Sequence, residues 1–228
     1  MKIPVKIINY LCDKAEVAKR VLQLGDDETF ALYGGTVRDC LLAHEFGTKV
    51  PKITDIDVVL NRKLKEKDLN KNKNIDLWMY NAFGGHKVTS RNINIDICSC
   101  VLAKNFDEFA AGMNFNCNCV FFVYPQKKLI ITKDFEDFLQ TKCIRKSSNK
   151  LVLKSGPFST AFDILLVSMK LSDRFGMRID ISDTIKKSLR NENRVVKERI
   201  AEYLNNKIRY ADFAKRLLQT YNLIVGGE

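Results

Sequence analysis

Hydrophobic residues follow two different spacings along the chain, and each spacing predicts a different kind of element. Between residues 5 and 24 they recur every three to four positions, which predicts an amphipathic helix. Shorter apolar runs of strand length follow, and we expect strands at 29–33, 56–60, 75–80, 87–89, 93–101, 117–123 and 129–131. Short helices are expected after Gly35, at 106–111 and at 135–141. The apolar pattern places Trp78 and Tyr80 in the core.

The pattern changes after Pro157, where only helical spacing remains. We expect helices at 158–174, 180–190, 192–205 and 209–224. The sequence therefore predicts an α+β protein with two domains, namely a head at 1–145 that contains all the expected strands and a helical region at 146–228.

The net charge of +11 is unevenly distributed between these two parts. Residues 1–141 hold 20 basic and 18 acidic side chains, whereas residues 142–228 hold 18 basic and 9 acidic ones. Such an excess of positive charge favours contact with a polyanion such as RNA, although a well-solvated helical surface explains it equally well. If the protein binds RNA, we expect the helical region to contribute most of the contacts.

The composition bears on where the protein works. Hydrophobic residues make up 46% and charged residues 29% of the 228 positions, and no apolar run approaches the ~20 residues that a membrane helix needs. Seven cysteines, an odd number in a chain whose start does not resemble a signal peptide, favour reduced thiols. These features predict a cytoplasmic protein that does not enter a membrane, and they leave its oligomeric state open.

Two glycines lie between the strand at 29–33 and the helix that follows it. Gly34 and Gly35 let the backbone approach a phosphate closely, and the N–H groups of a first helical turn form an anion site. Alone, a Gly-Gly pair between a strand and a helix is more often only a turn.

Two acids open the next strand. Asp55 and Asp57 alternate with Ile56, so both carboxylates point to one face while Ile56 points to the core. Carboxylates held this close repel each other unless a cation lies between them. The pair therefore predicts a two-metal site for Mg²⁺, with Mn²⁺ as an alternative, of the kind that supports in-line phosphoryl transfer. The same D-x-D pattern also occurs in surface turns.

A third acid lies inside the apolar strand at 93–101. Asp96 alternates with Ile95 and Ile97, and an acid in such a strand is costly unless it is paired or coordinates a metal. We expect Asp96 to be the third catalytic carboxylate, which ligates a metal or takes a proton from an attacking hydroxyl. The alternative is a structural ion pair with Arg38 or a lysine.

Taken together, these segments resemble a known family. The run YGGTVRDCLL at 33–42, followed by TDIDVV at 54–59, resembles the G-G-x-V-R-D-x-L-L … D-I-D signature. That signature belongs to the class II tRNA nucleotidyltransferases (CCA-adding enzymes) and bacterial poly(A) polymerases of the DNA polymerase β superfamily. The likeness continues at 82–85, 114–119, 129–139 and 158–180.

The resemblance implies a fold and a reaction. The fold would be a polymerase β-type head, a mixed sheet with flanking helices, followed by an all-α neck-like region. The reaction would be metal-dependent transfer of NMP from an NTP such as ATP to the 3′ end of an RNA, in particular tRNA. Asp55 and Asp57 would bind the metals, and Asp96 would be the third catalytic acid. The residues that would bind the nucleotide and its phosphates are Gly34, Gly35, Thr36, Arg38 and Asp39.

Two segments depart from the family pattern. The R-R-D segment, which helps to bind the triphosphate and sugar, is replaced by GMN at 112–114. The neck segment E-D-x-x-R, which selects the base, corresponds to 155–163, where no arginine occurs. Because an arginine edge supplies the paired hydrogen bonds that read a base, the sequence leaves nucleotide choice open.

Three functions are compatible with this sequence. The first is an active but divergent nucleotidyltransferase acting on RNA 3′ ends. The second is a toxin-like or regulatory transferase that modifies tRNA or a protein hydroxyl. The third is a catalytically inactive module that binds RNA or nucleotides. The presence of all three acids favours an active enzyme.

Overall fold

The computed structural model describes residues 3–50, 52–53, 55–80, 85–99, 105–111, 113, 115–146, 161–176, 178–191, 193–206 and 211–226. These residues form two compact units, one made of the described residues up to 140 together with Lys146, the other of 141–145 and 161–226. Three segments that the sequence analysis compares with the family pattern lie wholly or partly outside the described residues. The residues concerned are 82–84, 112, 114 and 155–160.

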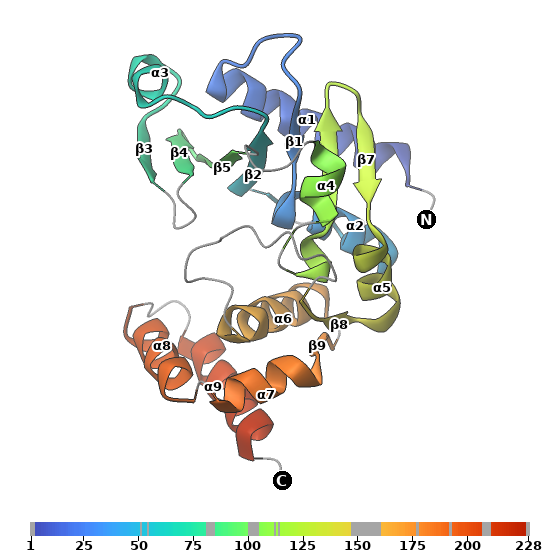
Figure 1. Ribbon diagram of the computed structural model, residues 1–228, viewed down its shortest axis with the longest axis vertical. Coiled ribbons are helices and arrows are strands. Elements are labelled where there is room, and N and C mark those ends of the chain that lie inside the picture. Colours follow the sequence, from blue (N-terminus) through green and yellow to red (C-terminus); the bar gives the residue numbers. More distant parts are fainter. Residues whose placement is uncertain are drawn as a thin grey trace. The chain divides into compact units, whose positions relative to one another are not determined.

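A seven-stranded sheet forms the centre of the first unit (Figure 1). Its strands lie in the order β3-β4-β5-β2-β1-β6-β7, and β2 and β5 run parallel while the other neighbouring strands run antiparallel. The strands are β1 (Phe30–Leu32), β2 (Asp55–Leu60), β3 (Leu77–Tyr80), β4 (His86–Ser90), β5 (Ile93–Ser99), β6 (Val120–Tyr124) and β7 (Lys128–Ile131).

Helices cover both faces of this sheet. On one face α4 (Phe106–Ala111) packs Phe109 against Val59 and Phe121, and each such buried side chain contributes roughly 1.5–3 kcal/mol. On the other face α1 (Val5–Leu22) contacts β6 through a hydrogen bond between Tyr124 and Glu16. The remaining helices of this unit are α2 (Gly34–Glu45), α3 (Glu66–Lys71) and α5 (Lys133–Thr141).

The strand β3 lies at the edge of the sheet, which changes the expected environment of its side chains. Tyr80 is 59% exposed, so its predicted core position is wrong. Its hydroxyl bonds Glu66, and the Trp78 indole N–H donates to Asn70 at 2.8 Å, so both rings lie on the face that α3 covers. Alternation places Leu77 and Met79 on the other face.

Two expected elements begin three residues later than their hydrophobic pattern predicts. The strand expected from Cys117 begins at Val120, because Asn116–Asn118 form the 3₁₀ turn η1, in which the Asn116 side chain accepts from the Cys117 N–H at 2.9 Å. The helix expected from Asp180 begins at Asp183, because β9 (Asp180–Ile181) pairs in parallel with β8 (Cys143–Ile144).

The second unit is mainly helical. Its helices are α6 (Ala161–Phe175), α7 (Asp183–Asn191), α8 (Asn193–Asn206) and α9 (Ala211–Gly226). Tyr221 on α9 is fully buried, and its hydroxyl donates to the Leu189 carbonyl oxygen on α7 at 3.3 Å. The predicted α+β class, a mixed sheet with flanking helices followed by helices, is confirmed. Across the described residues, every helix is too short or too polar to cross a membrane.

Candidate active site

The parallel pairing of β2 with β5 brings two of the predicted acids side by side. Asp57 lies opposite Asp96 in the register of the two strands, and Asp55 lies opposite Asn94. Ile56, Ile95 and Ile97 alternate with these residues and are buried on the other face. We call the side of the sheet that carries Asp55, Asp57 and Asp96 the carboxylate face.

The first turn of α2 lies directly against Asp57. The Thr36 N–H donates to Asp57 Oδ2 at 3.4 Å, and the Thr36 hydroxyl accepts from the Asp57 N–H at 2.8 Å. Gly34 has φ +55°, and a Cβ atom at this position would lie 2.8 Å from Asp57 Oδ2. Both the backbone conformation and the close approach of the carboxylate therefore favour glycine at position 34. Gly34 and Gly35 are the first residues of α2 itself.

Asp57 has an unusual affinity for protons. The pKa of its carboxyl is raised to about 6, first by burial and then by the neighbouring Asp96 carboxylate, against the opposing effects of Arg38 and the N–H groups of Thr36 and Gly35. Burial, together with Asp57 and Asp96, also holds the pKa of the Tyr33 hydroxyl well above its ordinary value. The site therefore carries more negative charge than its surroundings stabilise, and a cation would relieve this repulsion.

The other two acids each lie beside a polar side chain of a neighbouring strand. Asp55 is exposed, and its Oδ1 accepts from the Asn94 side-chain amide at 2.8 Å. Asp96 Oδ2 lies 3.5 Å from Lys87 Nζ, so the lysine pairing that the sequence left as an alternative is present. Among the described residues, no three Asp, Glu, His or Cys side chains gather closely enough to form a metal site.

Arg38 connects the first turn of α2 to η1. Its Nε donates to Asp39 Oδ1 at 2.7 Å, and its Nη1 donates to Asn118 Oδ1 at 2.8 Å. A Cβ atom at Gly35 would lie 3.5 Å from both Arg38 Nη2 and Asp57 Oδ2, so arginine and carboxylate flank this glycine. The sequence did not identify Asn118 as a site residue, although it belongs to the segment 114–119 that resembles the family.

Replacing Arg38 by methionine is expected to lower the free energy of unfolding by about 3 kcal/mol, because it removes a cation beside the buried carboxylate of Asp39. Urea denaturation measures this change. The matched control is Arg62→Met, since Arg62 also donates to a carboxylate at 2.8 Å, that of Glu28, but is 46% exposed. The control should lose less than about 1 kcal/mol. Equal losses in the two variants would contradict the argument that the Arg38–Asp39 pair matters more for stability because Asp39 is buried.

In the second unit, an arginine of another helix lies beside Asp163, which ends the segment that contains no arginine of its own. Asp163 is the last residue of the segment 155–163, and Arg199 of α8 lies 3.7 Å from its carboxylate. The Arg199 guanidinium also lies 5.2 Å from the centre of the Phe162 ring. Because 36 positions separate Asp163 from Arg199, a motif of adjacent residues could not reveal this pair.

Comparison with known proteins supports the fold. No protein-family model matches the sequence, and no curated protein matches it. Among solved structures, a CCA-adding enzyme with CTP is 18% identical with a TM-score of 0.55, covering 95% of this chain and 53% of that one. The Thermotoga maritima CCA-adding enzyme complexed with tRNA is also 18% identical, with a TM-score of 0.58 and coverage of 95% and 54%.

A third similar structure is a tRNA nucleotidyltransferase complexed with a primer tRNA and an incoming ATP analogue. It is 18% identical, with a TM-score of 0.53, and the match covers 90% of this chain and 62% of that one. The chain thus spans little more than half the length of the solved structures that it matches. The resemblance inferred from the sequence is confirmed in the fold, which is that of tRNA nucleotidyltransferases.

Proposed function

We propose that the protein is a metal-dependent nucleotidyltransferase that transfers NMP from an NTP to the 3′ hydroxyl of an RNA, forming a phosphodiester and releasing pyrophosphate, with tRNA as the first candidate. The observation that carries this proposal is the position of Asp57, which lies beside Asp96 in register and against the first turn of α2. The solved structures of similar fold contain CTP, ATP or tRNA, which supports the same classes of ligand here.

The donor set fits a divalent cation with a preference for oxygen ligands. Asp57 and Asp96 are adjacent carboxylates, and Asp96 adds to the effect of burial in raising the pKa of Asp57. Asp55 shares their face and is exposed. We therefore assign Mg²⁺, or Mn²⁺ in its place, to Asp55 and Asp57, with Asp96 as the third acid. When bound, the metal neutralises developing charge on the phosphates and activates the attacking hydroxyl.

The remaining residues of the site bind and orient the nucleotide. The backbone at Gly34 and Gly35 has no side chain to exclude a phosphate, and the N–H groups of this turn point toward negative charge. Arg38 adds a guanidinium held in place by Asp39 and Asn118. Asp96, accessible on the carboxylate face, is the base that would accept a proton from the acceptor hydroxyl.

One experiment separates the three functions that the sequence left open. The protein is incubated with Mg²⁺, each labelled NTP in turn and a tRNA pool, in parallel with Asp55→Ala and Asp57→Ala. Label retained on RNA only by the wild type supports the proposal. Label that stays with polypeptide after RNase treatment would assign a protein hydroxyl as acceptor. RNA binding without transfer of any label would identify an inactive binding module.

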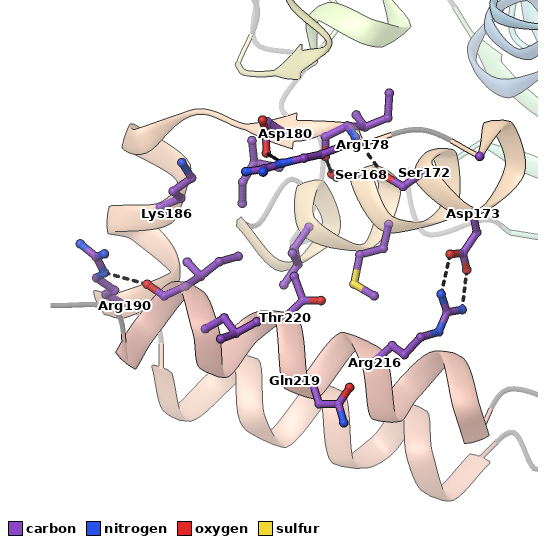
Figure 2. Close-up of a pocket in the computed structure, with 17 residues that line it drawn as sticks. Ser168, Ser172, Asp173, Arg178, Asp180, Lys186, Arg190, Arg216, Gln219 and Thr220 are labelled. Atoms are coloured by element: carbon purple, nitrogen blue, oxygen red, sulfur yellow. Dashed lines mark hydrogen bonds and ion pairs between the residues drawn. The ribbon is translucent and has the colours of Figure 1, made fainter. Parts of the chain in front are cut away.

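We further propose that residues 1–145 form the catalytic head and that residues 146–228 bind RNA. The helical unit contains a cavity of about 950 Å³ between α6, β9, α7 and α9 (Figure 2). Basic side chains stand around an apolar interior, and three of them pair with acids: Arg216 with Asp173 at 2.6 Å, Arg178 with Asp180 at 2.8 Å and Lys186 with Asp183 at 2.9 Å. The fourth basic residue around this cavity is Arg190.

If this cavity binds phosphates, the double variant Arg178→Gln/Arg190→Gln should bind tRNA about tenfold more weakly at low salt. The slope of log affinity against log salt should become less negative by roughly 0.7–0.9 for each phosphate that the variant no longer neutralises. Fluorescence anisotropy at several salt concentrations measures both quantities. The control is Arg194→Gln, because Arg194 lies on α8, is 92% exposed and pairs with Glu198 outside the cavity. An unchanged slope in the double variant would exclude this cavity as the RNA surface.

A further inference from the structure

Two rows of side chains cross the carboxylate face from the candidate active site to the edge of the sheet. The strand register fixes both rows, because residues paired across neighbouring strands point to the same face. In order from β2 through β5 and β4 to β3, the first row is Asp57, Asp96, Lys87 and Met79, and the second is Asp55, Asn94, Thr89 and Leu77.

The part of these rows nearest the site is polar and connected. In the second row the Thr89 hydroxyl donates to Asn94 Oδ1 at 3.0 Å, and the Asn94 amide donates to Asp55 at 2.8 Å. In the first row Lys87 places an ammonium 3.5 Å from Asp96, and both side chains are about one-third exposed. A cation accessible to solvent therefore lies on β4, one strand further from Asp57 than Asp96.

The far end of the rows is apolar and exposed. Leu77 is 54% and Met79 is 49% exposed, although both belong to a strand of the main sheet (Figure 1). Their neighbours Trp78 and Tyr80 lie on the opposite face, bonded to side chains of α3. Proteins commonly protect edge strands with charged residues, so an uncharged, apolar edge next to a polar site indicates a surface that a partner covers.

We call the part of the carboxylate face formed by Lys87, Leu77 and Met79 the platform. We propose that the platform binds the unpaired 3′-terminal nucleotides of the acceptor strand, with Lys87 on a phosphate and Leu77 and Met79 against a base. This assignment rests on the proposed nucleotidyl transfer. The terminal hydroxyl has to reach Asp96, so the nucleotides before it must leave the site along a neighbouring surface. Three strand spacings of about 4.8 Å place Met79, at the far end of the platform, about 14 Å from Asp57.

The chemistry of the platform selects this occupant. Lys87 complements the negative charge of a phosphate, while the apolar pair complements the flat face of a heterocycle. A base within a duplex already stacks on its neighbours, whereas an unpaired base offers its face to a protein. The platform is also continuous with the candidate active site, which is where the 3′ end has to lie.

The test measures RNA binding separately from catalysis. A short single-stranded RNA labelled at its 5′ end is titrated with the protein, without NTP, and the acceptor and NTP KM values are measured in the transfer reaction. Lys87→Gln and Leu77→Ser/Met79→Ser should each raise the Kd for RNA and the acceptor KM about tenfold, while the NTP KM stays within about twofold. Because Leu77 and Met79 are half exposed, the double variant should fold as the wild type does.

Two controls match the variants in kind. Lys128→Gln removes an exposed lysine from β7, at the opposite edge of the same sheet. This lysine pairs with Asp107 of α4 at 3.2 Å. Val5→Ser removes an apolar side chain that is 73% exposed at the start of α1. Neither control should change RNA affinity. An effect as large in Lys128→Gln as in Lys87→Gln would overturn the proposal, because RNA affinity would then depend on the net positive charge of the protein and not on the position of Lys87.

Other outcomes distinguish this inference from the proposed function. Unchanged RNA affinity and acceptor KM in both platform variants, with an active wild type, would overturn the inference alone. A wild type that transfers no nucleotide would remove the proposed function, and the Kd values would still decide whether RNA occupies the platform. A dimer that Leu77→Ser/Met79→Ser dissociates without loss of RNA affinity would assign the edge to a second copy and overturn the proposal.

Discussion

An Asp57→Asn variant is expected to lose at least about 1,000-fold in nucleotide transfer and to be more stable than the wild type at pH 8. The loss follows from the cation, because an amide cannot balance its charge and the several kcal/mol of charge stabilisation that a metal supplies correspond to about three orders of magnitude in rate. Asparagine keeps an oxygen that can accept from the Thr36 N–H, so the first turn of α2 should remain in place.

The gain in stability follows from the pKa of Asp57. Its folded-state pKa is about 6, above the value of about 3.9 of an unfolded chain, so ionisation is harder in the folded protein. Below about pH 4 both states are protonated and the group costs nothing. As the pH rises through 6 the folded state loses stability, and the full cost of about 2–3 kcal/mol is present at pH 8. Asparagine removes this cost.

Urea denaturation of Asp57→Asn and wild type between pH 4 and 8 measures the effect. The difference in unfolding free energy should be near zero at pH 4 and reach about 2–3 kcal/mol at pH 8. Asp55→Asn is the control, since its exposed carboxylate pays little for desolvation, so this variant should lose activity without a gain in stability. A stability difference that does not change with pH would contradict the assignment to Asp57.

Added Mg²⁺ should stabilise the wild type and leave Asp57→Asn almost unchanged. A cation that binds the folded wild type stabilises it by about 2.7 kcal/mol at a concentration one hundred times its Kd. Asp57→Asn, which lacks the charged ligand, should show little of this stabilisation. Metal binding can therefore offset the stability that the wild type loses by keeping Asp57 ionised. A residue that lowers stability but is needed for function is a common trade-off at active sites.

The sequence predicted most elements of the head because their patterns are local. Strand alternation around Ile56 is enough to place Asp55 and Asp57 on one face, and the structure bears out this orientation. The pairing of Asp57 with Asp96 is different, because β3 and β4 intervene in the chain between two strands that are neighbours in the sheet. Such a register depends on tertiary packing, which no short window of sequence contains.

Long-range partners were missed for the same reason. Asn118 reaches Arg38 across 80 positions, and Arg199 reaches Asp163 across 36. The apolar pattern of β3 likewise does not reveal whether the strand is central or at an edge, so it predicts a core position for Tyr80 and gives no sign that Leu77 and Met79 are exposed. Their exposure points to a function only in combination with the strand register, which places them on the carboxylate face.

Gly34 and Gly35 should respond differently to alanine, although the sequence gives them the same role. A Cβ atom at Gly35 would make contacts of 3.5 Å, which are ordinary, and Gly35 does not have a positive φ. Gly35→Ala should therefore fold normally, and any loss of activity would reflect a methyl group between Arg38 and Asp57, where we place the phosphates. Gly34 has both a positive φ and a contact of 2.8 Å.

Gly34→Ala is therefore expected to lower both stability and activity. The left-handed backbone costs about 1–2 kcal/mol for a residue with a Cβ atom, and the collision with Asp57 Oδ2 must displace either the carboxylate or the helix. A displacement of about 1 Å at a reacting group costs about 100-fold in rate, so transfer should fall by at least that factor. Urea denaturation and the labelled-NTP assay measure the two effects.

The matched control for Gly34→Ala is Gly47→Ala, because Gly47 has φ +64° but its Cβ atom would meet nothing within 4 Å. This variant has the same backbone strain without the collision, so it should lose about 1–2 kcal/mol of stability and keep its transfer rate. The difference between the two variants isolates the contact between Gly34 and Asp57. Equal activity in both would mean that the close approach of the turn to the carboxylate is not needed for transfer, and Asp57 would then have to act independently of α2.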